Sequence, residues 1–569
     1  MGYPLAEHLN VDYSGGLNQR LGARLLADNE ATTLTNVDIS VPGVRRKRYE
    51  PTAKVTLDAA ATTPVNGLHP YIRSGTPYLV AICNAKLYEW DGSTTPTGET
   101  GATVSTTNRV FMQQAYDGAA SVIYGTDQTN TVFKWDGTTW TQPTINDSGG
   151  AALGAANDLL WFKNRMWYAV GDQVHFSDLN TAESITIPSL RIRFGAGDSI
   201  LRLLPWREDK LLVFKGSVQG VGSIHVIDVA SYNIVALFHD LPIVGAGAIV
   251  RVGVNDSSDV FYMTREGLRS LHTTEDGEIT GPSLPVSYNI DDEVSGDIQW
   301  NQTPQSVHAI VFDDELLWFV PAVAATYPNK ILAYTMRPPK TSGFQGWTKI
   351  TSHPAFTAAL IGFGGAKPHL YIGKNTGGII QRAFDTATGT DSQYVEISKK
   401  ITFNLPDEKP AWYHDKTPFK LIVLTGETHQ GDLRISLLYE NGEEAVLGIF
   451  QPSAGGLFLP FTLPASLGGA QITESTIECW YDQNNVAIHR SKDFRVKITS
   501  NDNPEIIGFW FQAFIERSRF IGLGNTEQVA VTGAGVQEAD SDDDFTAGTI
   551  ENANGILGED VVAAANGGS

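Results

Sequence analysis

The chain contains one short phrase twice, and the spacing of the two copies restricts the fold more than any other feature. The copies are Leu87-Tyr-Glu-Trp-Asp-Gly-Ser-Thr94 and Val132-Phe-Lys-Trp-Asp-Gly-Thr-Thr139, which lie 45 residues apart. Each copy is an apolar strand that ends in Trp-Asp-Gly and small hydroxyl residues. Periods of roughly 20–50 residues are typical of repeat architectures, and four-stranded propeller blades fall near about 40–45 residues. The repeat therefore predicts a closed ring of small β-sheets.

Weaker versions of this strand pair recur between residues 70 and 390. The first run of each pair is nearly all apolar, as expected for a strand that is covered on both faces by neighbouring blades. Because radial repetition leaves only short sheet edges, we expect a β-propeller of roughly six to eight blades, with a pair of β-sandwiches as the structural alternative. The first runs are Tyr78–Ile82, Ser121–Tyr124, Leu159–Phe162, Leu211–Phe214, Val260–Met263, Leu316–Val320 and His369–Gly373.

Length and composition predict an all-β protein with more than one domain. A chain of 569 residues exceeds one ordinary domain, and its 56 Gly and 27 Pro indicate many turns. We expect an extended N-terminal assembly arm at 1–50, the β-propeller at 51–390, a β-sandwich at 391–526 and a flexible acidic tail rich in Gly and Ala at 527–569. Residues 29–36 are expected to form one or two helical turns. The absence of a signal peptide or a long apolar run predicts cytoplasmic synthesis without membrane insertion.

Motifs that carry chemistry are absent from the sequence. The 12 His lack the spacing of zinc ligands, and neither a Gly-x-Ser-x-Gly elbow nor a phosphate-binding loop occurs. The acidic run at 540–544 resembles the start of a calcium loop, but Phe545 stands where the sharp turn needs Gly. We therefore predict no catalytic residue, no metal site and no cofactor, and no enzymatic activity.

Glycoside cleavage is the enzymatic alternative, because one Asp recurs in each of four units. Catalysis needs two carboxylates whose environments separate their pKa values. An Asp at the same place in every unit is better explained as a turn former that binds local backbone N–H groups. By the same argument, Trp90 and Trp135 are expected to pack between blades, with a sugar-binding platform as the alternative. The recurring carboxylates are Asp91, Asp136, Asp178 and Asp228.

A basic cluster stands out in a chain whose formal net charge is −22. Such an acidic balance argues against nucleic-acid binding by neutralisation of phosphates. The cluster consists of Arg45, Arg46, Lys47 and Arg48. Its simpler interpretation is a solvated strand or turn, and its functional interpretation is a docking patch for an acidic neighbour. These four residues are our candidate interface.

Four short segments stand out in the N-terminal part of the chain. They are Gly15-Gly-Leu-Asn18, Leu25-Leu-Ala-Asp-Asn-Glu-Ala31, Asn36-Val-Asp-Ile39 and Gly43-Val-Arg-Arg-Lys-Arg48. In this order they resemble the opening of tail nozzle proteins, also called tail tubular protein B, of short-tailed bacteriophages, in which a similar arm precedes a propeller. The segments Phe494–Ile498 and Ile507–Phe511 are similar to the closing strands of the same family.

The resemblance implies a structural virion protein of the phage tail. It implies a homo-oligomeric, hexameric ring that contacts the tail adaptor ring and fibre or spike proteins and extends the DNA-ejection channel. Genome DNA would pass without specific binding, which suits a negatively charged conduit. Deletion of residues 1–48 is then expected to leave the chain folded but to block its incorporation into tails. The alternative is a carbohydrate-binding or glycan-cleaving propeller that acts as a receptor-binding tail component, marked by exposed aromatic and carboxylate side chains at one mouth.

Overall fold

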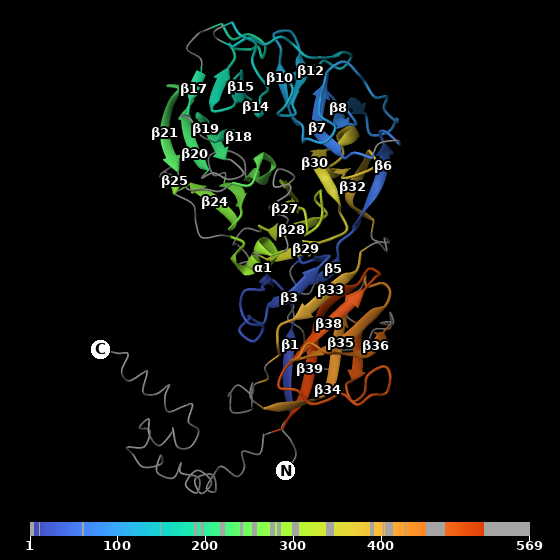
Figure 1. Ribbon diagram of the computed structural model, residues 1–569. Coiled ribbons are helices and arrows are strands. Elements are labelled where there is room, and N and C mark those ends of the chain that lie inside the picture. The colour runs from blue at the N-terminus through green and yellow to red at the C-terminus, as the bar shows by residue number, and fades with distance from the viewer. Residues whose placement is uncertain are drawn as a thin grey trace, which may run out of the picture.

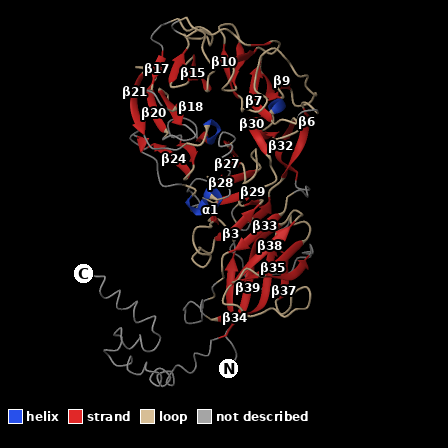
Figure 2. Ribbon diagram, in the orientation of Figure 1, coloured by secondary structure: helices blue, strands red, loops and turns tan. Residues whose placement is uncertain are grey.

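The computed structural model describes most of the chain between residues 5 and 516. The gaps are 11, 42, 60–61, 148–149, 187–190, 195–197, 207, 217–221, 239–242, 253–258, 274–278, 281–285, 297, 299–306, 337–345, 387–391, 402, 404–413, 427 and 451–472. The predicted tail at 527–569, with its acidic run at 540–544, lies outside the described residues. The regular secondary structure of the described part is almost entirely β-strand (Figure 2). Its helical elements are α1 (Asp291–Ser295) and the 3-10 turns Ala246–Ala248, Tyr288–Ile290 and Phe363–Gly365.

Seven small antiparallel sheets follow one another around a ring (Figure 1). The first strand of each sheet lies nearest the ring axis. The first blade consists of β7 (Val65–Arg73), β8 (Thr76–Cys83) and β9 (Lys86–Trp90), and the second of β10 (Phe111–Tyr116), β11 (Ser121–Thr126), β12 (Phe133–Trp135) and β13 (Trp140–Thr141). The third consists of β14 (Asp158–Phe162), β15 (Arg165–Val170), β16 (Gln173–Phe176) and β17 (Arg191–Arg193). The fourth consists of β18 (Ser199–Trp206), β19 (Lys210–Gly216), β20 (Ser223–Asp228) and β21 (Asn233–Phe238).

The seventh blade closes the ring with a strand from the N-terminal part of the chain. Strand β6 (Glu50–Thr56) pairs antiparallel with β32, from Ile379 opposite Thr56 to Thr386 opposite Glu50. This pairing joins the start of the propeller to its end. The predicted β-propeller is therefore confirmed, and it has seven blades. The fifth blade consists of β22 (Ile249–Val252), β23 (Asp259–Thr264), β24 (Gly267–Thr273) and β25 (Ile279–Thr280). The sixth consists of β26 (His308–Phe312), β27 (Glu315–Val320), β28 (Lys330–Thr335) and β29 (Trp347–Ile350). The seventh consists of β30 (Ala355–Ile361), β31 (His369–Lys374) and β32 (Ile379–Thr386), together with β6.

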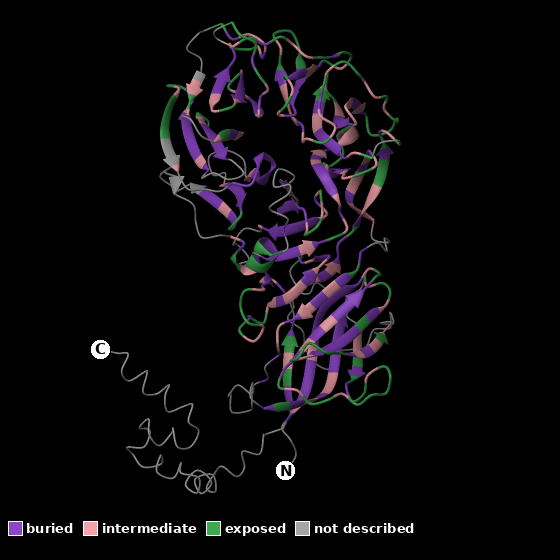
Figure 3. Ribbon diagram, in the orientation of Figure 1, coloured by how far each residue is buried: buried purple, intermediate pink, exposed green. Residues whose placement is uncertain are grey.

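Each pair of neighbouring blades shares a hydrophobic core, so seven cores complete the ring. Trp90 lies in the core between the seventh and first blades, and Trp135 lies between the first and second. Both side chains are 3% exposed, in keeping with the buried inner surfaces of the blades (Figure 3). The tryptophans are therefore packing residues, as predicted, and not an exposed sugar platform.

Three of the four recurring Asp residues act as turn formers, as predicted. Asp91 Oδ1 accepts hydrogen bonds from the backbone N–H groups of Ser93 and Thr94 at 2.9 and 2.8 Å. Asp136 and Asp228 accept equivalent pairs two and three residues further along the chain. Asp178 instead holds a longer loop, because it accepts hydrogen bonds from the hydroxyl groups of Ser184 and Thr186 and from the backbone N–H of Thr186. These local contacts satisfy backbone donors that a tight turn would otherwise leave to solvent.

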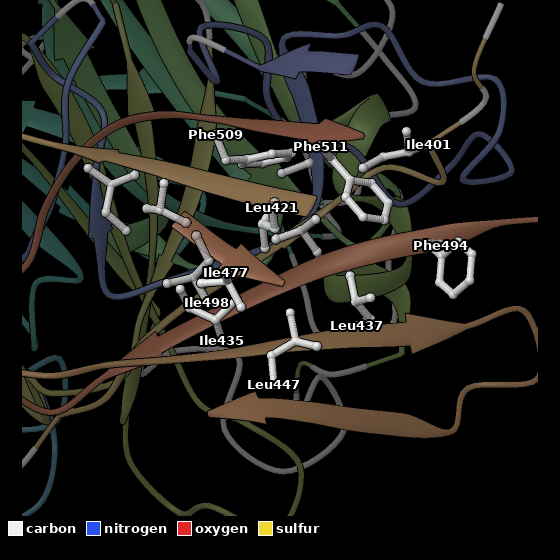
Figure 4. Packing of buried hydrophobic residues seen from close by; sticks show 14 of the residues in the cluster. Ile401, Leu421, Ile435, Leu437, Leu447, Ile477, Phe494, Ile498, Phe509 and Phe511 are labelled. Carbon is white, nitrogen blue, oxygen red and sulfur yellow. The ribbon is translucent and has the colours of Figure 1, made fainter. Parts of the chain in front are cut away.

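The second domain is a β-sandwich whose two sheets enclose one core (Figure 4). One sheet contributes Leu421, Phe509 and Phe511, and the facing sheet contributes Ile435 and Leu437. The first sheet contains β37 (Thr473–Glu478), β34 (Asp415–Thr425), β39 (Glu505–Glu516), β5 (Arg45–Lys47), β4 (Val37–Asp38) and β1 (Leu5–Asn10). The second contains β3 (Glu30–Thr35), β33 (Tyr394–Ser398), β38 (Phe494–Ser500), β35 (Leu433–Tyr439), β36 (Glu444–Phe450) and β2 (Gly16–Leu17).

The prediction of an extended N-terminal arm is wrong. Strand β1 pairs antiparallel with β39, with Leu5 opposite Phe514 and Asn10 opposite Phe509, and Leu34 of β3 is fully buried in the sandwich core. The sandwich is therefore built from both ends of the described chain. Strand β3 replaces the expected helical turns at 29–36, because its β-branched Thr residues favour extended backbone and because it pairs with β33.

One sheet runs from the propeller into the sandwich. The outer strand of the sixth blade, β29, pairs in parallel with β3 through Lys349 and Thr35. The sheet of the sixth blade thus continues through β3 and β33 into the second sheet of the sandwich. In Figure 1 the sandwich lies directly below β29. The two domains are consequently joined by backbone hydrogen bonds as well as by the chain itself.

Candidate functional sites at the domain junction and in the axial channel

The four predicted interface residues lie on and just after β5, between the sandwich and the propeller. Arg45, Lys47 and Arg48 are buried, with side-chain exposures of 1%, 2% and 6%, whereas Arg46 is 39% exposed. An accessible docking patch of four cations is therefore excluded. The prediction fails because β5 is an interior strand of its sheet, and not the solvated strand or turn that the local sequence suggests.

Each of the four cations has a carboxylate partner within the chain. Arg45 Nε lies 3.0 Å from Glu396 Oε2, and both side chains are 1% exposed. Arg45 also lies over the Tyr13 ring, at 4.6 Å. Burial raises the pKa of Glu396, although the Arg45 charge opposes the rise. The other pairs are Arg46 with Glu505 at 2.5 Å, Lys47 with Glu50 at 3.1 Å and Arg48 with Glu315 at 2.5 Å.

These pairs connect different parts of the molecule. Glu396 belongs to β33 of the sandwich, Glu505 to β39 of the opposite sheet and Glu315 to β27 of the propeller. A buried charge is tolerated only where an opposite charge or several hydrogen bonds replace its water. The basic cluster therefore has a structural role, because its ion pairs hold the two sandwich sheets and the sixth blade together.

Two further N-terminal segments contact the propeller beside this cluster. Asn36 Nδ2 donates to Thr351 Oγ1 at 3.0 Å and to the carbonyl of Gln393 at 2.8 Å. Gly16 adopts a positive φ of 70° against the backbone that precedes β29. Three of the four segments that carry the family resemblance, 15–18, 36–39 and 43–48, therefore lie in one contact region between the sandwich and the propeller, which we call the junction. The fourth, 25–31, packs within the sandwich, where Lys399 contacts the carbonyl of Leu26 and the carboxylate of Asp28.

A second candidate site lies on the propeller axis. A cavity of about 560 Å³ opens where the inner strands begin, and its lining includes Asn157, Tyr327 and Phe356. A cavity of about 310 Å³ continues between the inner strands. Arg109 and Phe111 line both cavities, so the two cavities adjoin, and we call them together the axial channel. Residues of the first, second, fourth, fifth, sixth and seventh blades line its inner part.

The channel lining is rich in cationic and aromatic groups. Arg109 Nη2 lies 3.2 Å from His308 Nδ1, and its guanidinium lies 4.8 Å from the Phe356 ring centre. Arg202 lies 5.0 Å from the ring centre of Phe111. Burial, together with repulsion by Arg202, lowers the pKa of Arg109 to about 9.

One carboxylate stands behind the channel wall. Arg202 Nε lies 3.7 Å from Asp158 Oδ2, which also accepts the Leu203 backbone N–H at 2.7 Å. Burial raises the pKa of Asp158, although Arg202 opposes the rise. Asp158 is 3% exposed and does not line either cavity. It therefore stabilises the wall and one guanidinium, and it is not placed to contact a ligand in the channel.

The described lining supports binding more than hydrolysis. It contains guanidinium, imidazole, amide and aromatic groups but no carboxylate, whereas canonical glycoside cleavage uses two. Among the described residues, no group of three His, Cys, Asp or Glu side chains is arranged to hold a metal ion. The same part of the chain has no helix long and apolar enough to cross a membrane. Sequence reasoning missed the channel residues because they lie outside the repeated strand pairs.

Comparison with known proteins gives no family assignment. No family model and no curated protein matches the chain. Among solved structures, a chain described as an ancestral GH74 enzyme shows 12% identity and a TM-score of 0.38, and the match covers 62% of this chain and half of that one. The WD40 β-propeller domain of Doa1 shows 10% identity, a TM-score of 0.35 and coverage of 58% and 96%. A chain of the Mitotic Checkpoint Complex shows 14% identity and a TM-score of 0.38, and the match covers 59% of this chain and 94% of that one. The blade-by-blade strand pairing carries the assignment of a β-propeller fold.

Proposed function

We propose that the protein is a structural subunit of a short-tailed phage tail, where a ring of its copies extends the DNA-ejection channel. One observation carries the proposal. Three of the four N-terminal segments that resemble tail nozzle proteins lie at the junction, where they contact the propeller, and the fourth packs beside them in the sandwich. Chance similarities in separate short motifs would have no reason to share one structural task.

The architecture suits a part that carries mechanical load. The continuous sheet through β29 and β3 and the buried ion pairs at the junction resist separation of the two domains. Breaking a buried ion pair by removal of one partner costs about 3–5 kcal/mol. Identical rigid subunits can close into a ring through head-to-tail contacts.

The charge of the chain suits passage of DNA. A formal net charge of −22 disfavours tight binding of phosphates, whose affinity depends on neutralisation by Lys and Arg. In this proposal the ring guides DNA by exclusion and carries out no chemistry on it. Ring contacts are made by surfaces other than Arg45, Lys47 and Arg48, since these three are used inside the subunit.

The proposal is tested by counting copies of the chain in purified virus particles with quantitative mass spectrometry. The hexameric ring that the resemblance implies predicts about six copies per particle, and a closed ring also predicts a matching oligomer of the purified chain in native mass spectrometry. Absence of the chain from particles overturns the proposal, and so does a copy number of several dozen, which indicates a capsid decoration.

A further inference from the structure

The axial channel is a candidate ligand site that the structural role does not use. We propose that it binds a small hydroxylated anion, such as an acidic sugar, whose oxyanion group lies between Arg109 and Arg202. The inference concerns the interior of one subunit, so it stands or falls independently of ring assembly.

The two guanidinium groups line one cavity, and an aromatic ring supports each of them. Arg109 precedes β10 of the second blade, Arg202 belongs to β18 of the fourth, and both line the 310 Å³ cavity. Each lies over an aromatic ring, Phe356 for Arg109 and Phe111 for Arg202. A guanidinium that stacks through its face presents its N–H donors at its edge, which matches the two oxygens of a carboxylate or phosphate.

Electrostatics within the channel favour an anion. The described lining of both cavities contains two Arg and two His but no Asp or Glu. Repulsion by Arg202 contributes to the lowered pKa of Arg109. Asp158 lies 3.7 Å from Arg202 Nε behind the wall, and an oxyanion between the two guanidinium groups would add attraction to both where they now repel each other. Charge interactions inside such a cavity are stronger than in water.

The imidazoles add neutral donors to the same site. His308 Nδ1 faces Arg109 Nη2 at 3.2 Å and therefore accepts its hydrogen bond. The proton of the neutral ring then lies on Nε2. Burial lowers the pKa of His69, which lines the same cavity, to about 4, so this ring is also neutral near pH 7. The positive charge of the site thus comes from the two guanidinium groups.

The mouth of the channel suits the remainder of such a ligand. Its volume of about 560 Å³ lies within the range of small-molecule sites. Asn108, Gln128 and Asn157 supply amide groups that can bind hydroxyls, and Tyr327 and Phe356 supply aromatic surface. The lining therefore matches a ligand that combines one oxyanion with several hydroxyl groups, rather than an extended apolar molecule.

The test is calorimetric titration of the full chain with three probes at constant ionic strength. Sodium glucuronate supplies a carboxylate on a sugar, inorganic phosphate supplies a free oxyanion, and glucose is the neutral control. We expect glucuronate to bind with a Kd of about 1 mM or tighter and glucose to show no binding. Saturable phosphate binding without glucuronate binding would leave the oxyanion site in place but overturn the acidic-sugar assignment.

Variants locate the binding. Arg109→Gln and Arg202→Gln are each expected to weaken binding at least about tenfold, as for loss of a charge-assisted contact. Arg382→Gln is the matched control, because Arg382 lies on β32 and outside both cavities. Arg202→Lys retains the charge and is used if a Gln variant fails to fold. Failure of both anions to bind, or binding unchanged in the channel variants, overturns the site. Ring assembly measured by native mass spectrometry reports separately on the proposed structural role.

Discussion

Arg48 and Glu315 form a bidentate ion pair across the junction, with Nη1···Oε2 and Nη2···Oε1 distances of 2.5 Å. Arg48 directly follows β5 of the sandwich, and Glu315 opens β27 of the propeller. The two side chains are 6% and 4% exposed. The pair therefore connects residues 267 positions apart in sequence and lies where water cannot replace either partner.

Removal of one partner of this pair should destabilise the protein strongly. Arg48→Met leaves the Glu315 carboxylate buried without its guanidinium, and we expect a loss of about 3–5 kcal/mol in the free energy of unfolding. Urea denaturation measures the loss. Lys367→Gln is the control, because its ion pair with Asp313 is solvent-exposed and should matter by less than about 1 kcal/mol. Equal stabilities of the two variants would contradict a structural role for the buried pair.

Gly16 should tolerate no side chain. Its φ of 70° is a left-handed conformation, and an added Cβ would lie 2.5 Å from Gly346 Cα and would also clash with the backbone nitrogen of Trp347. We expect Gly16→Ala to lower the free energy of unfolding by more than about 2 kcal/mol, since backbone strain and a backbone clash add. Gly22→Ala, with no atom within 4 Å of the added Cβ, should be nearly neutral. Thermal unfolding of both variants measures the difference in their stability. A Gly16→Ala protein as stable as the Gly22→Ala protein would disprove the tight contact.

Glu293 of α1 should make stability depend on acid pH. Burial alone would raise its pKa, but ion pairs with Lys330, at 2.7 Å, and with Lys349 lower the pKa to about 2. Since the folded-state pKa lies below the unfolded value of 4.5, the ionised group stabilises the protein above about pH 4.5. That stabilisation disappears as the pH falls from about 4.5 to about 2.

The corresponding variant is Glu293→Gln. It should lose about 2 kcal/mol of stability at pH 7, and its difference from the unmodified chain should shrink as the pH approaches about 2. Denaturant titrations across this pH range provide the measurement. Glu266→Gln is the control, because Glu266 is 65% exposed in its pair with Arg269. A Glu293→Gln difference that is independent of pH would exclude the ion pairs as its cause.

Deletion of residues 1–48 should unfold the sandwich, contrary to the expectation from sequence. The deletion removes β1 to β5, which pair with β39 and β33, and it removes Leu34 from the common core. Limited proteolysis should then cleave the C-terminal strands β34–β39 rapidly. The propeller retains β6, so its ring closure remains possible. A protease-resistant sandwich in the truncated chain would show that the N-terminal strands are dispensable.

The sequence alone determined the repeating part of the fold. The second strand of each blade is covered on both faces, so it contains a nearly continuous apolar run such as Leu316–Val320, and the spacing of these runs can be read from the sequence. Turns such as the one at Asp136 depend on residues two and three positions away. The inner strands were harder to recognise, because one face lines the axial channel. Strand β10, for example, reads Phe-Met-Gln-Gln-Ala-Tyr.

Only the tertiary structure decided what the N-terminal segment and the basic cluster do. Strand β1 pairs with β39, at the far end of the described chain, and the sequence of residues 5–10 does not identify that strand as its partner. The local sequence allows the four cations to form either a solvated patch or buried ion pairs. Arg45 and Arg48 form buried ion pairs because Glu396 and Glu315, on strands distant in sequence, lie next to them in the fold. Secondary structure and turns are set by neighbours in sequence, whereas the pairing of strand edges and of buried charges is set by the energy of whole surfaces that meet only in the folded chain.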